Sequence, residues 1–438
     1  MGRLAAWARL LLINLAVSGV LAELAALAGY AVLQRGLYYT RPAPPPAGAP
    51  VAAAAPVTNF RLSPYFGFTR APGQPLSALL EPQRLALMAA PAADAPWAKV
   101  STNQLGFLSP HDYPYAPAAA NSYIVGVFGG SVAQWFALQG AQVLAAQLAP
   151  ALAGRPLVLL NFANASYKQP QQALLLQYLL ATGQRLDAVL NIDGFNEIAL
   201  GTMNIEAGVA AAMPSVQNMG PLAALAPLDA DETRLLQLAE LLSARRRGAA
   251  AQAAADTHTL ALGWAVDRLR VALLARRVDA LVRGLSSAQS APSLVSLAPP
   301  PASKADGMEQ AVQLWVQGST LMRQTLAARG IPYLHLLQPN QYHGSRPMSE
   351  AEARIARSMA SVYAPRVVTG YPKLLQAGQG LRAAGESFID ATTVFDTVRE
   401  TVYADDCCHY NQRGNGLLAV LVAQVLATPA GLRPRAMP

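Results

Sequence analysis

Cysteine is scarce in this chain: only two occur among 438 residues, adjacent at positions 407 and 408. Neighbouring Cα atoms lie about 3.8 Å apart, below the roughly 4.4–6.8 Å usual for a disulfide, so we expect free thiols. The two-residue gap that is common between the cysteines of structural zinc sites is also missing. The spacing therefore argues against a disulfide framework and against structural zinc, and we predict no metal and no cofactor.

Charged residues are also few, at 13% of the chain against 53% hydrophobic residues. The net charge of +8 comes mainly from arginine, with no basic patch interleaved with aromatics. The densest basic run, ARRRGAA at 244–250, lies in an alanine-rich helical stretch and is typical of a solvated helix face. We therefore expect no nucleic-acid partner.

Long apolar runs are limited to one N-terminal segment, Leu10–Leu33, which excludes a polytopic membrane protein. Arg3 and Arg9 precede it, as the positive-inside rule prefers for the cytoplasmic end of a membrane span. A charged Glu23 at mid-span costs about 2.5–3.5 kcal/mol, which several leucines at about −0.3 to −0.6 kcal/mol each offset. The alternative is a signal peptide cleaved near Ala28, with Glu23 as its polar boundary.

Both interpretations export the rest of the chain. We expect a single-pass protein of the cell inner membrane, with its main domain in the periplasm or outside, or else a secreted protein. The predicted domains are the anchor or signal sequence at 1–40, a Pro/Ala-rich linker at 41–58, and one domain at 59–438 with a helical insertion at about 205–305.

Five short apolar runs, most of them followed by a helical pattern, predict the fold class. Near-continuous apolar strands that alternate with helices indicate a doubly wound α/β fold, with a parallel sheet covered on both faces. The predicted strands lie at 122–128, 156–162, 187–193, 332–338 and 387–390.

Polar residues follow these strands at the edge where ligands bind in open α/β sheets. Gly129-Gly130-Ser131 follows the first strand, Gly194-Phe195-Asn196 follows the third, and Asp406 to His409 follows the fifth. Each group by itself has a structural explanation: a Gly-Gly-Ser turn is usually only a turn, and an Asp before a helix is often a cap. Their order and placement together are more specific.

In this arrangement the chain resembles the SGNH hydrolases, the GDSL-type esterase/lipase superfamily, over residues 122–200 and 330–427. The resemblance implies a flavodoxin-like three-layer sandwich with a five-stranded parallel sheet. It also implies that Ser131 is the nucleophile, although glycine replaces the aspartate of the family's G-D-S block. The D-x-x-H block is matched in full and makes Asp406 and His409 the other two members of a catalytic triad.

The resemblance further implies an oxyanion hole made by the Ser131 N–H, the Asn196 amide and a second-block N–H. The family's second-block glycine is absent here, and we assign its role to Ser166. A backbone N–H performs it, so a non-glycine residue serves if its φ and ψ suit. Gly130, Gly194 and Gln338 are assigned to substrate binding.

The expected function is an extracytoplasmic serine ester hydrolase that removes acyl groups from a carbohydrate or another ester. The alternative is an O-acyltransferase that passes the acyl group to a cell-envelope polysaccharide with the same triad. A non-catalytic binding domain is a third possibility, and the intact Ser, Asn, Asp and His set argues against it.

Overall fold

The structure is a computed structural model, and it divides the chain into two compact units. One unit combines Met1–Thr58 with Ala224–Ser286, and the other combines Asn59–Ala223 with Ser287–Pro438. Apart from Arg41, the predicted linker at 41–58 lies outside the residues that the structure describes. The described residues are 2–34, 36–41, 60–80, 86–88, 96–116, 121–225, 232–255, 257–285, 303–358 and 360–428.

The larger unit contains a five-stranded, all-parallel sheet, which confirms the predicted fold class. The strand order β4-β3-β5-β6-β7 is the flavodoxin-like order, in which the first strand of the sheet lies second from one edge. The strands are β3 (Tyr123–Gly129), β4 (Leu157–Asn161), β5 (Ala188–Asp193), β6 (Tyr333–Leu337) and β7 (Ser387–Asp390). A short antiparallel pair, β1 (Phe60–Ser63) with β2 (Gly67–Arg70), precedes the sheet.

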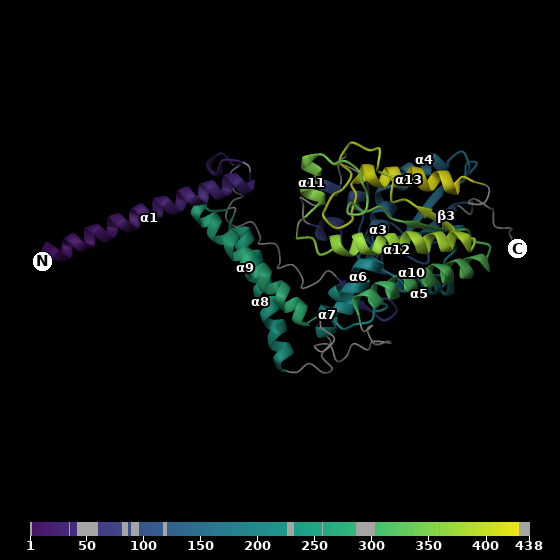
Figure 1. Ribbon diagram of the computed structural model, residues 1–438, viewed down its shortest axis with the longest axis horizontal. Helices are drawn as coiled ribbons and strands as arrows, with labels where there is room; N and C mark the ends of the chain where they lie inside the picture. The colour runs from purple at the N-terminus through teal and green to yellow at the C-terminus, as the bar shows by residue number, and fades with distance from the viewer. Residues whose placement is uncertain are drawn as a thin grey trace. The chain divides into compact units, whose positions relative to one another are not determined.

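Helices cover both faces of the sheet, because successive strand side chains point to opposite sides and both sides are apolar. Val125 and Val127 of β3 belong to the core cluster shared with α3 and α13, whereas Ile124 and Phe128 pack in the cluster shared with α5. Figure 1 shows α13 and α4 on one side of the sheet and α10 and α5 on the other. The helices of this unit are α3 (Ser131–Gln139), α4 (Ala141–Leu148), α5 (Gln171–Ala181), α6 (Phe195–Glu206), α7 (Val216–Leu225), α10 (Lys304–Ala327), α11 (Glu350–Ala356), α12 (Ala364–Ala383) and α13 (Gln412–Leu426).

A buried ionic network lies under the end of β5. His335 Nε2 is 2.8 Å from Asp193 Oδ1, and its Nδ1 is 3.0 Å from Glu386 Oε1, with all three side chains at most 1% exposed. Trp315 Nε1 donates to Asp193 Oδ1 at 2.6 Å. Burial lowers the pKa of His335, but the Asp193 and Glu386 carboxylates outweigh it and raise the pKa to about 9. The imidazolium therefore compensates two carboxylates that have no access to water.

We expect His335→Gln to lower the free energy of unfolding by about 3–5 kcal/mol at pH 7, because it removes the cation beside buried Asp193, whereas Glu386 keeps Arg323 at 3.8 Å. Since the pKa of folded His335 is raised, its stabilisation is full below the unfolded value of about 6.5 and is lost as the pH rises through about 9. Urea unfolding at several pH values measures both effects. His343→Gln, which removes a half-buried histidine, serves as the control. Equal stability of His335→Gln and wild type at pH 7 would contradict the charged network.

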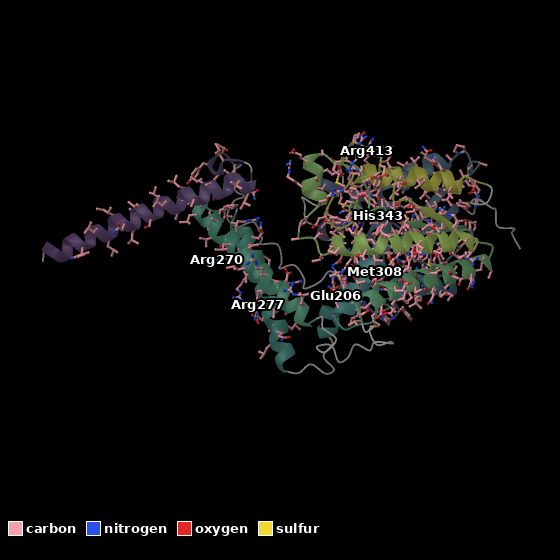
Figure 2. The ribbon with its side chains drawn as sticks, in the orientation of Figure 1. Glu206, Arg270, Arg277, Met308, His343 and Arg413 are labelled. Carbon is pink, nitrogen blue, oxygen red and sulfur yellow. The ribbon has the colours of Figure 1, made fainter. Side chains whose placement is uncertain are left out.

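The smaller unit joins the N-terminal helix to the middle of the chain. It contains α1 (Gly2–Gln34), η1 (Tyr38–Thr40), α8 (Glu232–Ala255) and α9 (Ala261–Leu285), and α8 and α9 pack as a helical pair. Figure 2 labels Arg270 and Arg277 on α9. Part of the predicted insertion thus folds with the N-terminal helix. Residues 13–34 of α1 are long and apolar enough to cross a membrane, as either an anchor or a signal sequence.

Candidate functional site

The turn after β3 presents Ser131 at the start of α3. Gly129 has φ +138°, and a Cβ there would lie 2.1 Å from the carbonyl oxygen of Ile192. A Cβ on Gly130 would lie 2.1 Å from Asn196 Nδ2, so only glycine lets this amide approach the backbone just before Ser131. As the first residue of α3, Ser131 has an N–H without an acceptor inside the helix, at the positive end of the helix dipole.

Ser131 and His409 meet although 278 positions separate them. His409 Nε2 lies 2.7 Å from Ser131 Oγ, a distance at which an imidazole takes the proton of an attacking hydroxyl. His409 is 6% exposed and sits on the turn that precedes α13. The fold therefore brings together the two residues that were assigned as nucleophile and base.

The carboxylate beside His409 is Asp405, whereas the sequence prediction was Asp406. Asp405 Oδ2 lies 2.5 Å from His409 Nδ1, on the opposite side of the ring from Ser131. Its other oxygen, Oδ1, accepts the backbone N–H groups of Cys407, Cys408 and His409 at 3.1, 3.1 and 3.2 Å. The chain curls around this carboxylate, and that curl brings the residue four positions before the histidine, rather than three, against the ring. We therefore replace Asp406 by Asp405 as the imidazole partner.

The rim loop after β6 holds this turn in place. Asn340 Nδ2 donates to the carbonyl of Cys407, and Gln341 Nε2 donates to the carbonyl of Asp405, both at 3.1 Å. These two side chains therefore bind the turn that carries Asp405 and His409. The sequence contained no signal for this role.

Cys407 Sγ and Cys408 Sγ lie 2.8 Å apart, farther than the roughly 2.05 Å of a disulfide bond. These sulfur atoms and a ring nitrogen of His409 lie within 4.8 Å of one another, so the ligand types for a soft metal ion are present. Both His409 nitrogens already contact Ser131 and Asp405. A metal bound through His409 would displace one of these contacts, so the geometry favours the hydrogen-bonded triad.

The loop after β4 contains Ser166, the residue assigned from the sequence as the second oxyanion donor. Ser166 has φ +67°, in the left-handed region that favours glycine, and this explains physically why a glycine suits the position. No hydrogen bond among the described residues uses the Ser166 N–H. Asn196 Nδ2 donates to the carbonyl of Tyr167 at 2.8 Å, which ties the two donor segments together. The Asn196 amide has a second N–H for a ligand.

Gly194 and Gln338 lie in different environments. Gly194 has φ +108°, and a Cβ there would lie 2.3 Å from Leu337 Cδ1, so close packing explains this glycine. Gln338 is buried at the end of β6, and its Nε2 has no hydrogen-bond partner among the described residues. Substrate contact by Gly130, Gly194 and Gln338 stays a prediction.

Glu197 and Lys168 are buried behind the turns that carry Asn196 and Ser166. From the sequence Lys168 was a possible substrate contact, and Glu197 had no assigned role. Glu197 accepts the N–H groups of Gly194 and Gln169 at 2.9 and 3.0 Å, and so fixes both turns. Lys168 Nζ donates to the carbonyls of Ala211 and Met213. Burial raises the pKa of Glu197 to about 8, with Asp193 adding to the effect, and burial lowers the pKa of Lys168 to about 7 against the pull of Glu197.

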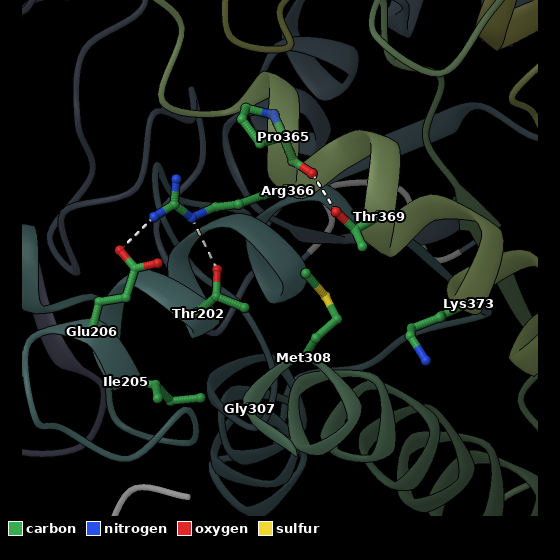
Figure 3. A pocket seen from close by; sticks show the side chains of 9 residues that line it. All are labelled: Thr202, Ile205, Glu206, Gly307, Met308, Pro365, Arg366, Thr369 and Lys373. Atoms are coloured by element: carbon green, nitrogen blue, oxygen red, sulfur yellow. Dashed lines mark hydrogen bonds and ion pairs between the residues drawn. The ribbon is translucent and has the colours of Figure 1, made fainter. Parts of the chain in front are cut away.

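A separate pocket of about 460 Å³ lies between α6, α10 and α12 (Figure 3). The Arg366 guanidinium there donates to Glu206 and Thr202, so its charge is already compensated. None of the pocket's lining residues belongs to the triad or to the oxyanion donors. We therefore place the candidate active site at the carboxyl edge of the sheet.

No protein-family model matches this chain, and no curated protein matches it.

Proposed function

We propose that this protein is a serine ester hydrolase with Ser131 as nucleophile, His409 as base and Asp405 as the acid that orients the imidazole. The observation that carries the proposal is the continuous contact from Ser131 Oγ to His409 and on to Asp405 at the carboxyl end of a parallel sheet. This order of nucleophile, base and orienting carboxylate is the geometry that defines serine hydrolase triads.

The mechanism follows from these contacts. Ser131 Oγ attacks the ester carbonyl carbon while its proton passes to His409 Nε2. The carbonyl oxygen becomes an oxyanion facing the N–H groups of Ser131 and Ser166 and the amide of Asn196. Collapse of the intermediate breaks the ester bond, and His409 returns the proton to the leaving alcohol. Water then attacks the acyl-enzyme with His409 again as base, releasing the acid and Ser131.

The alternative acyl acceptor is a polysaccharide hydroxyl, which would make the protein an O-acyltransferase. The first half of the reaction is the same, and the acceptor decides between the two. Ester-bearing carbohydrates are the proposed substrates in both versions.

We also propose that α1 stays attached as an inner-membrane anchor, with the hydrolase unit in the periplasm. Glu23 Oε1 and Oε2 accept the N–H groups of Ala261 and Leu262 at 2.8 Å, and Ala26 is buried against the same helix pair. Cleavage near Ala28 would remove Glu23 and Ala26 and leave the first turn of α9 without this cap. These contacts support an anchor over a cleaved signal sequence.

The full-length protein in detergent provides the test. We expect hydrolysis of p-nitrophenyl acetate, and a fluorophosphonate should label one serine, Ser131, by peptide mass spectrometry. Adding acetylated oligosaccharides with a second oligosaccharide as acceptor distinguishes hydrolysis from transfer, because transfer yields a newly acylated acceptor. Labelling of a different serine, or turnover of no ester in the panel, would overturn the hydrolase assignment.

A further inference from the structure

The helices α1 and α9 both expose apolar side chains. The described side chains between Leu10 and Leu21 of α1 are exposed, and α9 exposes Val266, Leu269 and Leu273. Large exposed apolar side chains that gather on a surface are typical of sites that bind a membrane or a partner.

A groove of about 630 Å³ runs between these two helices. Small side chains of α1 form one wall, among them Ala22, Ala25 and Gly29, and Trp264, Leu269 and Ala272 belong to the α9 wall. The single charged residue in the lining is Arg268. The groove therefore has the dimensions and polarity of a site for hydrocarbon with one anionic group at its edge.

Arg268 has N–H donors that are available for a ligand. It donates to Gln252 Oε1 at 2.9 Å and makes no ion pair within the part of the chain that the structure describes. A guanidinium carries five N–H donors and suits phosphate in particular. Five arginines against two aspartates on α9 give the helix a positive balance, which complements anionic lipids.

The contacts of Glu23 fix α9 to the proposed membrane anchor. Because Glu23 caps the first turn of α9, that turn lies at the same depth in the membrane as Glu23. The apolar residues 13–34 of α1, which are long enough to cross a membrane, include the α1 wall of the groove. The groove therefore adjoins the proposed membrane span.

We propose that the α1–α9 groove binds an anionic phospholipid of the surrounding membrane, with an acyl chain along the small-residue wall and the phosphate at Arg268. This inference rests on the proposed anchor role of α1. In this proposal the α8–α9 pair holds the protein against the membrane surface.

The test uses the full-length protein in vesicles of phosphatidylcholine, with or without phosphatidylglycerol. p-Benzoylphenylalanine is placed singly at Leu269, at Val17 in α1, or at Val368 in α12, and lipid adducts are measured by mass spectrometry after illumination. Leu269 and Val368 are both 62% exposed and therefore form a matched pair. We expect adducts at Val17 and Leu269 to exceed those at Val368 about fivefold or more, and phosphatidylglycerol to be favoured at Leu269.

The outcomes separate the two proposals. Absence of lipid adducts at Val17 would contradict the anchor itself. Adducts at Val17 without adducts at Leu269, or protein adducts at Leu269, would overturn the lipid groove and leave the anchor standing. Arg268→Gln should abolish the preference for phosphatidylglycerol at Leu269, and an unchanged preference would overturn the role of Arg268.

Discussion

Ser131→Ala and His409→Ala should each lower kcat/KM for ester hydrolysis by a factor of about 10⁴–10⁶. Ser131 Oγ is the atom that forms the bond to the acyl group, and His409 Nε2, 2.7 Å away, is positioned to take its proton. Without either group the other has no function, so the double variant should be about as impaired as each single variant. Initial rates with p-nitrophenyl acetate measure the loss.

A serine and a histidine elsewhere in the larger unit provide the controls for this experiment. Ser387→Ala changes an exposed serine on β7, and His343→Gln changes a half-buried histidine on the rim loop. Both should retain activity within about twofold, since surface changes away from special contacts have small effects. An unchanged circular dichroism spectrum excludes misfolding. If the Ser131→Ala and His409→Ala losses multiplied in the double variant, the two residues would not act as one unit.

Asp405→Asn should lower kcat by about 10⁴, whereas Asp406→Asn should change it less than about tenfold. The asparagine at 405 still offers an oxygen to the N–H groups of the turn, but it removes the negative charge that stabilises the imidazolium during the reaction. Asp405 lies 2.5 Å from His409 Nδ1 and its side chain is 17% exposed, so water replaces this interaction poorly.

The pair of neighbouring aspartates makes this a matched comparison, measured by kcat with a saturating ester. The larger loss in Asp406→Asn would restore the D-x-x-H assignment and contradict the hydrogen bonding of the turn. Equal large losses would mean that the whole turn, and not one carboxylate, sets the position of His409.

The sequence alone predicted the parallel sheet, because five apolar runs alternating with helices leave few other ways to bury both faces of each strand. The same pattern placed Ser131, Asn196 and His409 at the carboxyl edge. The carboxyl ends of parallel strands lie at the same edge of the sheet, whatever the conformation of the loops. The sequence therefore predicted that these three residues, which are far apart in the chain, lie near one another.

The side-chain contacts made by the loops could be determined only from the tertiary structure. Either Asp405 or Asp406 is compatible with the spacing to His409, and the choice depends on how the backbone curls around one carboxylate. The supporting contacts of Glu197 and Lys168 depend on long-range packing, which local patterns do not encode. The same holds for Glu23, whose partners on α9 lie more than 230 positions away.

The cysteine-containing segment at 404–416 shows which properties the sequence predicted and which the tertiary structure decided. Its sequence predicted a histidine and a carboxylate close together near a helix start, because their spacing along the chain brings them to the same turn. Only the fold decided that Asp405 faces His409 Nδ1 while Ser131 faces Nε2. Side-chain partners are set by the packing of segments that are distant in sequence, and that information belongs to the tertiary structure.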